Sequence, residues 1–453
     1  MLFRLLPIVL PRLLPILLAC SCASASAEPQ PPAASPPAAS VITATAESVY
    51  KSAHPKLLQI RTLVEGTGKQ SSIGSGFLVT ADGLAVTNYH VVSQQALEPQ
   101  TYRMEYAAPD GTLGTIRLLA IDVVNDLAVV QLEKGGWPFF EFDSRALAGE
   151  LPKGERIYSM GNPLDLGFTI VEGNYNGLVE RSYNERVHFT GSLNPGMSGG
   201  PAVTADGRIV GINVAKQIGG EQVSFLVPAK FAAALVERAR KDSPLDFANT
   251  RKEIGRQLGQ WQAGLYQAID DEGLRRITLG PYQTSESAAP WFTCWSSTNA
   301  DRIPKPRALT NATSCDMQTS LFISSELSTG GITLHNVYAH TSELNAFQFS
   351  HFLSSYLTSA WANTGSGSRR HTSERCHEDF LRAGDAAGHP VVRAVWCARA
   401  YRDFDDLYDV SAVAITQDRD NEALLTHLDM RGVSYENAMT TARRYMGAIQ
   451  WAK

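Results

Sequence analysis

One serine is enclosed by turn-forming residues in a way that suits nucleophilic chemistry. Residues 193–203 read LNPGMSGGPAV, which places Ser198 between glycines and prolines and shortly before an apolar run. Glycine reaches positive φ at low cost and proline fixes φ, so this composition predicts a tight turn. A turn that presents one hydroxyl beside inward-facing N–H groups suits acyl transfer. The alternative is an ordinary Gly-Pro loop, in which serine is common.

Two other residues complete a set that could activate this hydroxyl. His90 follows the apolar run at 84–87, and Asp126 directly precedes the apolar run at 127–132. A histidine can remove the proton of a serine as general base, and a carboxylate can orient the imidazole. Taken singly, His90 could be a surface histidine and Asp126 a turn residue. Because all three lie at strand-to-loop junctions, we predict a triad of His90, Asp126 and Ser198.

Short β segments separated by turns must position these residues. Apolar runs of strand length lie at 57–60, 76–80, 84–87, 115–119, 127–132, 156–160 and 208–212, with a hairpin turn at 81–83. Strands this short and this closely spaced predict an all-β barrel or sandwich.

Five motifs follow one another in a fixed order. They read GSGF at 74–77, TNYHVV at 87–92, DLAVV at 126–130, GNP at 161–163 and NPGMSGGP at 194–201. Together they resemble the trypsin-like serine peptidases, most of all the HtrA/Deg branch of bacteria, over about residues 45–240. The resemblance implies an all-β double β-barrel of chymotrypsin-like fold, with His90 and Asp126 on the first barrel and Ser198 on the second. It also implies an oxyanion hole formed by the backbone N–H groups of Gly196 and Ser198.

The sequence departs from the family's pattern at two positions near the nucleophile. Met197 replaces the polar residue usual at this position, so activation by an acid that pairs with a newly cut amino terminus is not expected. Ser192 stands at the base of the expected specificity pocket, where no acid could attract lysine or arginine. Val214 and Ala215 add small and apolar walls on the facing strand. The resemblance therefore implies cleavage after small or medium apolar residues.

The first 27 residues are typical of an export signal. Prolines and an arginine interrupt their apolar run, whereas a membrane-spanning helix needs about 20 apolar residues in succession. Residues 25–27 (ASA) form a small-residue cleavage site, and residues 17–20 (LLAC) resemble a lipoprotein box in which Cys20 is lipidated. Both alternatives predict export to the periplasm, the second with a lipid anchor in the outer membrane. Residues 28–45, rich in Pro, Ala and Ser, predict a disordered linker.

Length and composition limit the classes of function. The chain has 453 residues, of which 44% are hydrophobic and 19% charged, and its net charge is −5. This length predicts two to three domains, and a mildly acidic chain without a basic block gives no reason to expect nucleic acid. No cofactor or metal is expected, because no histidine or cysteine stands at zinc-finger spacing. The expected partners are polypeptide substrates, and the HtrA/Deg branch makes an oligomer an open alternative.

Residues 243–453 lack the carboxylate-binding loop of the PDZ domain that usually follows in this branch. A helix is expected where apolar residues share one face, at Ile254, Leu258, Trp261, Leu265 and Ile269. Beyond it, two cysteine pairs have the same spacing of 21 residues, and each is followed by two β-like runs and a helix. We predict an α+β domain with an internal duplication. Three disulfide pairings are formally open, and the simplest joins Cys294 to Cys315 and Cys376 to Cys397.

The sequence thus predicts an exported serine endopeptidase of residues 46–242 that acts on envelope proteins, in their processing or quality control. The second domain, without a catalytic set of its own, is expected to capture substrates or partners. The alternative is a chain that keeps the peptidase fold but serves as a chaperone or binding module.

Overall fold

The computed structural model describes residues 44–214, 223–241, 245–317, 319–361, 369–384 and 387–452. The predicted export signal, Cys20 and almost all of the predicted linker lie outside these ranges, as does Ala215. Within them, no helix is both long and apolar enough to cross a membrane.

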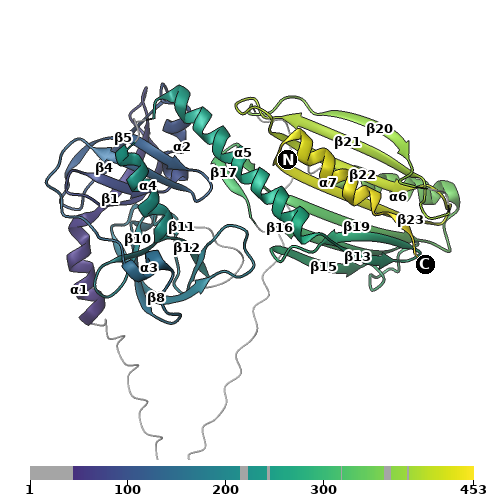
Figure 1. Ribbon diagram of the computed structural model, residues 1–453, viewed down its shortest axis with the longest axis horizontal. Coiled ribbons are helices and arrows are strands. Elements are labelled where there is room, and N and C mark those ends of the chain that lie inside the picture. The colour runs from purple at the N-terminus through teal and green to yellow at the C-terminus, as the bar shows by residue number, and fades with distance from the viewer. Residues whose placement is uncertain are drawn as a thin grey trace, which may run out of the picture. The chain divides into compact units, whose positions relative to one another are not determined.

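Six antiparallel strands close the first barrel (Figure 1). They pair in the order β1-β2-β3-β6-β5-β4, and their bounds are Leu57–Val64 (β1), Gln70–Leu78 (β2), Leu84–Thr87 (β3), Tyr102–Ala107 (β4), Leu113–Asp122 (β5) and Leu127–Leu132 (β6). Helix α1 (Ala44–Ala53) and a 3-10 turn (His54–Lys56) precede β1, and α2 (Tyr89–Leu97) follows β3. The predicted turn at 81–83 joins β2 to β3, with Gly83 at φ 92°. Alternate apolar side chains such as Leu58, Ile60 and Val130 fill the interior.

Six further strands close the second barrel, in the order β10-β11-β12-β9-β8-β7. Their bounds are Arg156–Gly161 (β7), Thr169–Leu178 (β8), Val187–Phe189 (β9), Pro201–Val203 (β10), Ile209–Val214 (β11) and Ser224–Pro228 (β12). The helical segments of this barrel are α3 (Ser144–Ala148), a 3-10 turn (Pro163–Asp165) and α4 (Ala229–Lys241). Helix α4 returns to the first barrel and packs on β5 and β6. The predicted double barrel is confirmed.

The remainder of the chain is built on a seven-stranded antiparallel sheet (Figure 1). Its order is β15-β16-β19-β23-β22-β21-β20, with bounds Phe292–Thr298 (β15), Leu309–Met317 (β16), Ile332–His340 (β19), Arg375–Leu381 (β20), Val392–Ala400 (β21), Tyr408–Thr416 (β22) and Glu422–Val433 (β23). A small sheet joins β13 (Leu274–Leu279), β14 (Tyr282–Ser287) and β24 (Gln450–Trp451). This region is α+β, as predicted.

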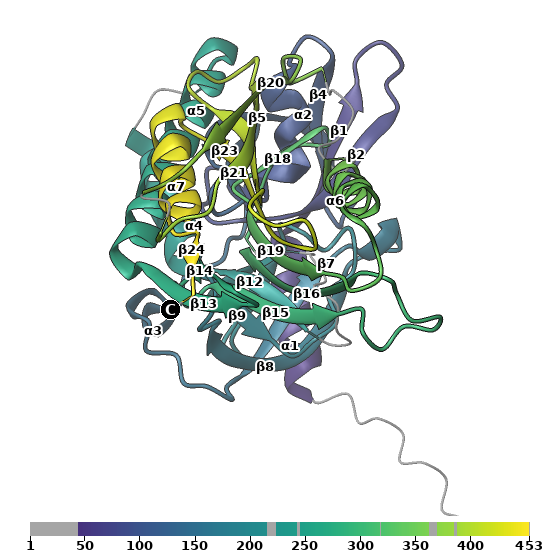
Figure 2. The same cartoon turned by 90° about the vertical axis from the view of Figure 1, so that its right-hand side faces the viewer.

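Helices cover both faces of the large sheet. Helix α5 (Phe247–Glu272) buries the predicted apolar face and shares a core with α7 (Tyr435–Gly447) and with Leu428 of β23. Helix α6 (Ala346–Trp361) instead packs through Phe349 against Leu425 of β23. Because these leucines are an odd number of residues apart on one strand, they face opposite ways. Figure 2 shows α6 and α7 on opposite sides of the sheet.

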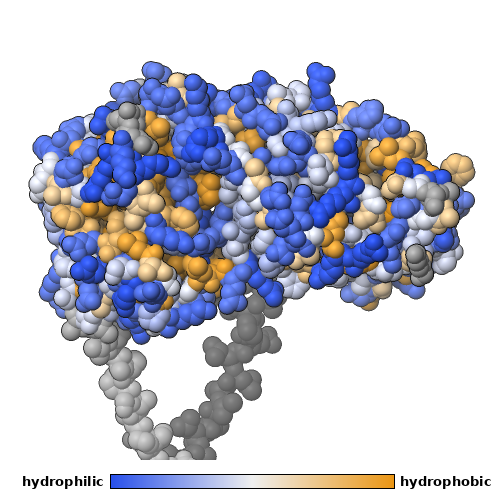
Figure 3. Space-filling model, in the orientation of Figure 1, coloured by the Kyte–Doolittle hydropathy of each residue, from blue (hydrophilic) through white to orange (hydrophobic). Residues whose placement is uncertain are grey.

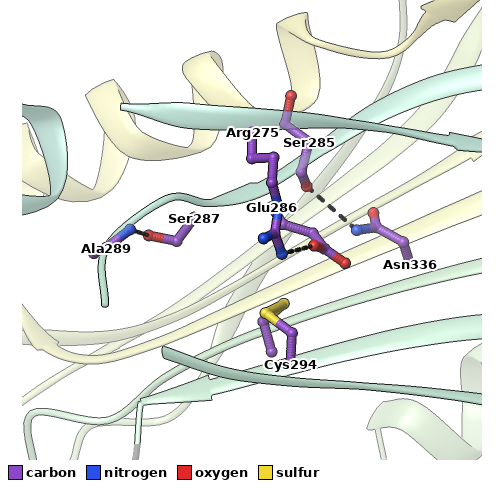
Figure 4. The surroundings of a disulfide bond; sticks show 8 residues. Arg275, Ser285, Glu286, Ser287, Ala289, Cys294 and Asn336 are labelled. Carbon is purple, nitrogen blue, oxygen red and sulfur yellow. Dashed lines mark hydrogen bonds and ion pairs between the residues drawn. A yellow bond between two sulfur atoms is a disulfide. The ribbon is translucent and has the colours of Figure 1, made fainter. Parts of the chain in front are cut away.

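Both disulfides join neighbouring strands at the outer edges of this sheet. Cys294 lies opposite Cys315 on β15 and β16, and Cys376 lies opposite Cys397 on β20 and β21. Figure 4 shows the first of them beside the ion pair of Arg275 and Glu286, whose atoms lie 2.7 Å apart. The two halves of the predicted duplication therefore begin at opposite edges and meet where β19 pairs with β23.

The halves differ at one strand. In the second half, β22 lies in the sheet between β21 and β23. In the first half, the segment at the corresponding place forms a separate hairpin of β17 (Leu321–Ser324) and β18 (Leu327–Thr329). Strand β16 consequently pairs directly with β19. We refer to β17 and β18 as the hairpin below.

Candidate active site

The pairing of β3 with β6 brings His90 to Asp126. His90 begins α2 directly after β3, and Asp126 directly precedes β6. The Nδ1 atom of His90 lies 2.6 Å from Oδ2 of Asp126, and the backbone N–H of His90 donates to Oδ1 at 2.9 Å. An ionised carboxylate can only accept hydrogen bonds, so Nδ1 of His90 must be the donor. The proton of the neutral imidazole therefore lies on Nδ1, and Nε2 keeps its lone pair. The first two members of the predicted triad are thus in contact.

The backbone of Asp126 adopts a left-handed conformation. Its φ is 59°, in a region that aspartate and asparagine occupy more often than other residues except glycine. Two hydrogen bonds to its carbonyl hold it there, from the backbone N–H of Tyr89 at 3.1 Å and from Nδ2 of Asn88 at 2.7 Å. The TNYHVV motif therefore fixes the acid as well as supplying the histidine.

The electrostatics of the pair suit a general base. Burial lowers the pKa of His90, but the negative charge of Asp126 and its hydrogen bond raise this pKa by more, so that it lies above its ordinary value. The His90 side chain keeps 30% of its surface exposed, against 14% for Asp126. The imidazole therefore remains partly accessible to solvent, while the carboxylate of Asp126 stays largely enclosed.

Ser198 lies in a turn between β9 and β10 that depends on glycine. Gly196 and Gly199 have φ of 94° and 83°. A Cβ on Gly196 would lie 2.4 Å from a backbone oxygen of Asn162, and one on Gly199 would lie 2.3 Å from that of Ser75. Neither position accepts a side chain without a backbone shift.

Hydrogen bonds from the GSGF motif of the first barrel hold this turn in place. The backbone N–H of Ser75 donates to the Ser198 carbonyl at 2.8 Å, and the Ser75 hydroxyl donates to the Gly196 carbonyl at 2.7 Å. These bonds hold the serine turn of the second barrel against the first barrel, which carries His90 and Asp126. Ser75 belongs to a predicted motif, but its contact with the turn was not predicted.

Hydrogen bonds also set the direction of the two N–H groups predicted to form the oxyanion hole. The Pro195 carbonyl accepts from the Leu164 N–H at 3.0 Å. The Met197 carbonyl accepts from the Gly200 N–H at 3.1 Å and from Nδ2 of Asn213 at 3.2 Å. In a trans peptide the N–H points opposite to the carbonyl, so the N–H groups of residues 196 and 198 are directed away from these partners.

Of the predicted specificity residues, Val214 lines a cavity and Ser192 does not. Val214 ends β11 and lines a cavity of about 180 Å³ together with Phe225 of β12 and Asp126. Ser192 is exposed and is not among the residues that line this cavity. Two further walls, Leu321 and Phe322, come from the hairpin and were not predicted.

Comparisons with known proteins agree with the double barrel. A family model described as "Trypsin-like peptidase domain" matches residues 74–212. The chain is 30% identical over 231 residues to "Putative serine protease HhoB" of Synechocystis sp., which covers 47% of this chain and 53% of that protein. It is 28% identical over 177 residues to "Probable periplasmic serine endoprotease DegP-like" of Chlamydia muridarum, which covers 37% of this chain and 34% of that protein. These comparisons confirm the predicted resemblance to the HtrA/Deg branch.

The similarity covers only part of each relative. The chain spans about half, or less, of the length of these curated relatives. Among solved structures, a serine endoprotease from Yersinia pestis aligns with a TM-score of 0.38 and 23% identity, over 43% of this chain and 66% of that chain.

Proposed function

We propose that this chain, whose residues 74–212 match the trypsin-like peptidase domain, is a serine endopeptidase that works through an acyl-enzyme on Ser198. The observation that carries the proposal is the contact of His90 with Asp126 at 2.6 Å, which leaves Nε2 of His90 able to accept a proton. The relatives named as serine proteases support the same activity. The peptidase domain then comprises residues 46–242, and residues 243–453 form a second domain.

In the acylation step, Nε2 of His90 removes the proton of the Ser198 hydroxyl as its oxygen attacks the carbonyl carbon of the peptide bond. The oxygen of the tetrahedral intermediate becomes negative and is held by the N–H groups of Gly196 and Ser198. Asp126 stays ionised and stabilises the imidazolium. His90 then gives its proton to the leaving amine as the C–N bond breaks.

In the deacylation step the same groups act on water. His90 removes a proton from the attacking water, and the oxygen of that water forms the second tetrahedral intermediate. Collapse of the intermediate breaks the ester bond, and the proton on His90 returns to Ser198. The carboxylic acid of the new C-terminus leaves, and the enzyme is restored.

The surroundings of the triad favour apolar substrates. Val214 and Phe225 line the cavity beside Asp126. Ser192, which the resemblance places at the base of the specificity pocket, lies outside this cavity and carries no charge that would attract a basic side chain. On the face of the molecule in Figure 3, apolar side chains lie in patches over the two barrels. We therefore propose cleavage after small or medium apolar residues of envelope proteins, in their processing or quality control.

The proposed location is the periplasm. The name of the Chlamydia muridarum relative calls it periplasmic, and residues 1–27 are typical of an export signal. Lipidation of Cys20, with anchoring in the outer membrane, is the finer proposal. The mass of the mature amino terminus tests it, because the lipidated form begins at Cys20 and keeps residues 20–27 together with the lipid, whereas cleavage after residue 27 leaves a free amino terminus at residue 28.

A fluorophosphonate probe tests the activity, because it reacts with an activated serine. We expect covalent labelling of the full chain that is lost in Ser198→Ala and kept in Ser297→Ala, a matched change at an exposed strand position. A wild-type chain that stays unlabelled but still binds unfolded casein would contradict the proposal and favour a binding module.

A further inference from the structure

The hairpin of the second domain is anchored beside the candidate triad. Its residues Leu321, Ile323 and Leu327 are buried in one core with residues of α2 in the first barrel. The hydroxyl of Tyr89, the residue before His90, donates to the Ile323 carbonyl at 3.0 Å, and the Tyr89 side chain is fully buried. The hairpin is thus fixed by apolar burial and by a buried hydrogen bond.

Phe322 alternates with these anchors and lies against the imidazole. Its ring centroid is 6.0 Å from that of His90, with the rings nearly perpendicular at 76°. Phe322 is half-buried and lines the cavity of about 180 Å³ that Asp126, Val214 and Phe225 also line. The cavity therefore has walls from both barrels and from the second domain.

Helix α5 braces the hairpin and the walls of this cavity together. Nε1 of Trp261 donates to Oδ1 of Asn184, a further residue of the cavity wall, at 2.8 Å. The Trp261 ring also packs on Gly330, directly after the hairpin, where a Cβ would lie 2.5 Å from it. One turn earlier, Oε1 of Gln257 accepts from the backbone N–H of Val123, three residues before Asp126, at 2.8 Å.

The segment of the second half that corresponds to the hairpin is placed differently in the fold. Strand β22 in the second half contributes to the large sheet, and β17 does not. In the first half, β17 does not pair with the large sheet, and its half-buried Phe322 lies beside His90 instead. A segment needed only for the sheet would bury its apolar side chains there, as β22 does.

We propose that Phe322 is a specificity-determining residue of the peptidase. It forms the wall of a subsite for an apolar substrate side chain, and this inference rests on the proposed function. The pocket for the residue just before the cleaved bond is expected against β11, with Val214 on one wall. Val214 and Phe322 line the same cavity, and the ring centroid of Phe322 lies 6.0 Å from that of His90, so we assign this cavity to the next side chain on the amino-terminal side.

The test compares two peptides that differ only at the second residue before the cleaved bond, which is leucine in one and alanine in the other. Affinities are measured with the full-length Ser198→Ala chain, which binds without turnover, and kcat/KM is measured with the wild type. We expect both quantities to favour leucine by at least about tenfold, the lower end of the discrimination that one methylene group provides in an apolar pocket. In Ser198→Ala/Phe322→Ala the affinity ratio should fall toward one.

Two further variants separate recognition from folding. Phe347→Ala makes the same change at an exposed position of α6 and should keep the leucine preference. Phe322→Leu keeps apolar bulk on the hairpin and should give an intermediate ratio, even if the alanine variant fails to fold. An affinity ratio that neither change at Phe322 alters, or no binding of either peptide, would overturn the inference. A chain that shows the expected affinities but hydrolyses neither peptide refutes the proposed activity and leaves the subsite in place.

Discussion

Replacement of Asp126 by asparagine isolates what the carboxylate contributes. Oδ1 of Asp126 accepts from the backbone N–H of His90 at 2.9 Å, and an amide can accept there only through its oxygen. The amide nitrogen of the variant must then face Nδ1 of His90, at the position of Oδ2. Because that nitrogen donates, Nδ1 becomes the acceptor and the imidazole proton moves to Nε2, where it blocks removal of the Ser198 proton.

The predicted loss in kcat is about 10⁴-fold, the effect of the wrong tautomer in a triad of this kind. This corresponds to about 5 kcal/mol of transition-state stabilisation. Stability should change little, because asparagine has the same size and tolerates the φ of 59° found at this position. The variant separates a chemical defect from a folding defect.

The assay is hydrolysis of a fluorogenic peptide by Asp126→Asn and by the wild type, with thermal unfolding followed in parallel. Asp110→Asn, on an exposed turn, is the matched control and should keep full activity. A loss below about tenfold in a chain that unfolds at the wild-type temperature would refute the proposed role of the carboxylate. Equal losses in Asp126→Asn and Asp110→Asn would refute it as well.

Three further predictions follow from the same contacts. The pKa of His90 is raised above 6.5 and catalysis needs the neutral imidazole, so kcat/KM should rise with pH through a midpoint above 6.5. Tyr89→Phe leaves the buried Ile323 carbonyl without its donor and should lower the free energy of unfolding by about 1–3 kcal/mol in a denaturant titration. Gly199→Ala should abolish activity and destabilise the chain by more than the roughly 1–2 kcal/mol of a positive φ, because its Cβ would meet the Ser75 carbonyl at 2.3 Å.

Two of these predictions have an internal control. Tyr435→Phe removes a hydroxyl from an exposed tyrosine and should leave the unfolding free energy nearly unchanged. Gly111 has φ of 87° with nothing within 4 Å of its added Cβ, so Gly111→Ala should show only the backbone cost. Equal destabilisation by Gly111→Ala and Gly199→Ala would contradict the steric argument. A pH midpoint at or below 6.5 would contradict the raised pKa of His90.

The sequence predicted the parts of the site that local motifs determine. Residues around Ser198 restrict the backbone strongly, and the TNYHVV and DLAVV motifs lie next to strands whose apolar runs are clear. The position of His90 beside Asp126 then follows from one strand pairing, β3 with β6. The cysteine spacing likewise placed each pair on neighbouring strands, because a short loop between two extended runs favours an antiparallel pair.

The hairpin was not predicted, for a physical reason. Its residues at 321–324 have the pattern of a strand, and a strand pattern does not specify which partner it pairs with. Its burial depends on Tyr89, more than 200 positions earlier, and this contact leaves no periodic signal. The exposure of Ser192 was missed for a similar reason, since spacing from Ser198 gives the position on the chain but not the surroundings of the side chain.

The proposed mechanism is tested most directly by the rate at which a fluorophosphonate modifies Ser198, measured by mass spectrometry of the peptide that contains this residue. The proposed triad predicts modification at Ser198 alone in the wild type and much slower modification in His90→Ala, in which peptide turnover should also fall by about 10⁶-fold. Modification of Ser198 at the same rate in the wild type and in His90→Ala would show that no base activates this hydroxyl, and it would contradict the proposed mechanism.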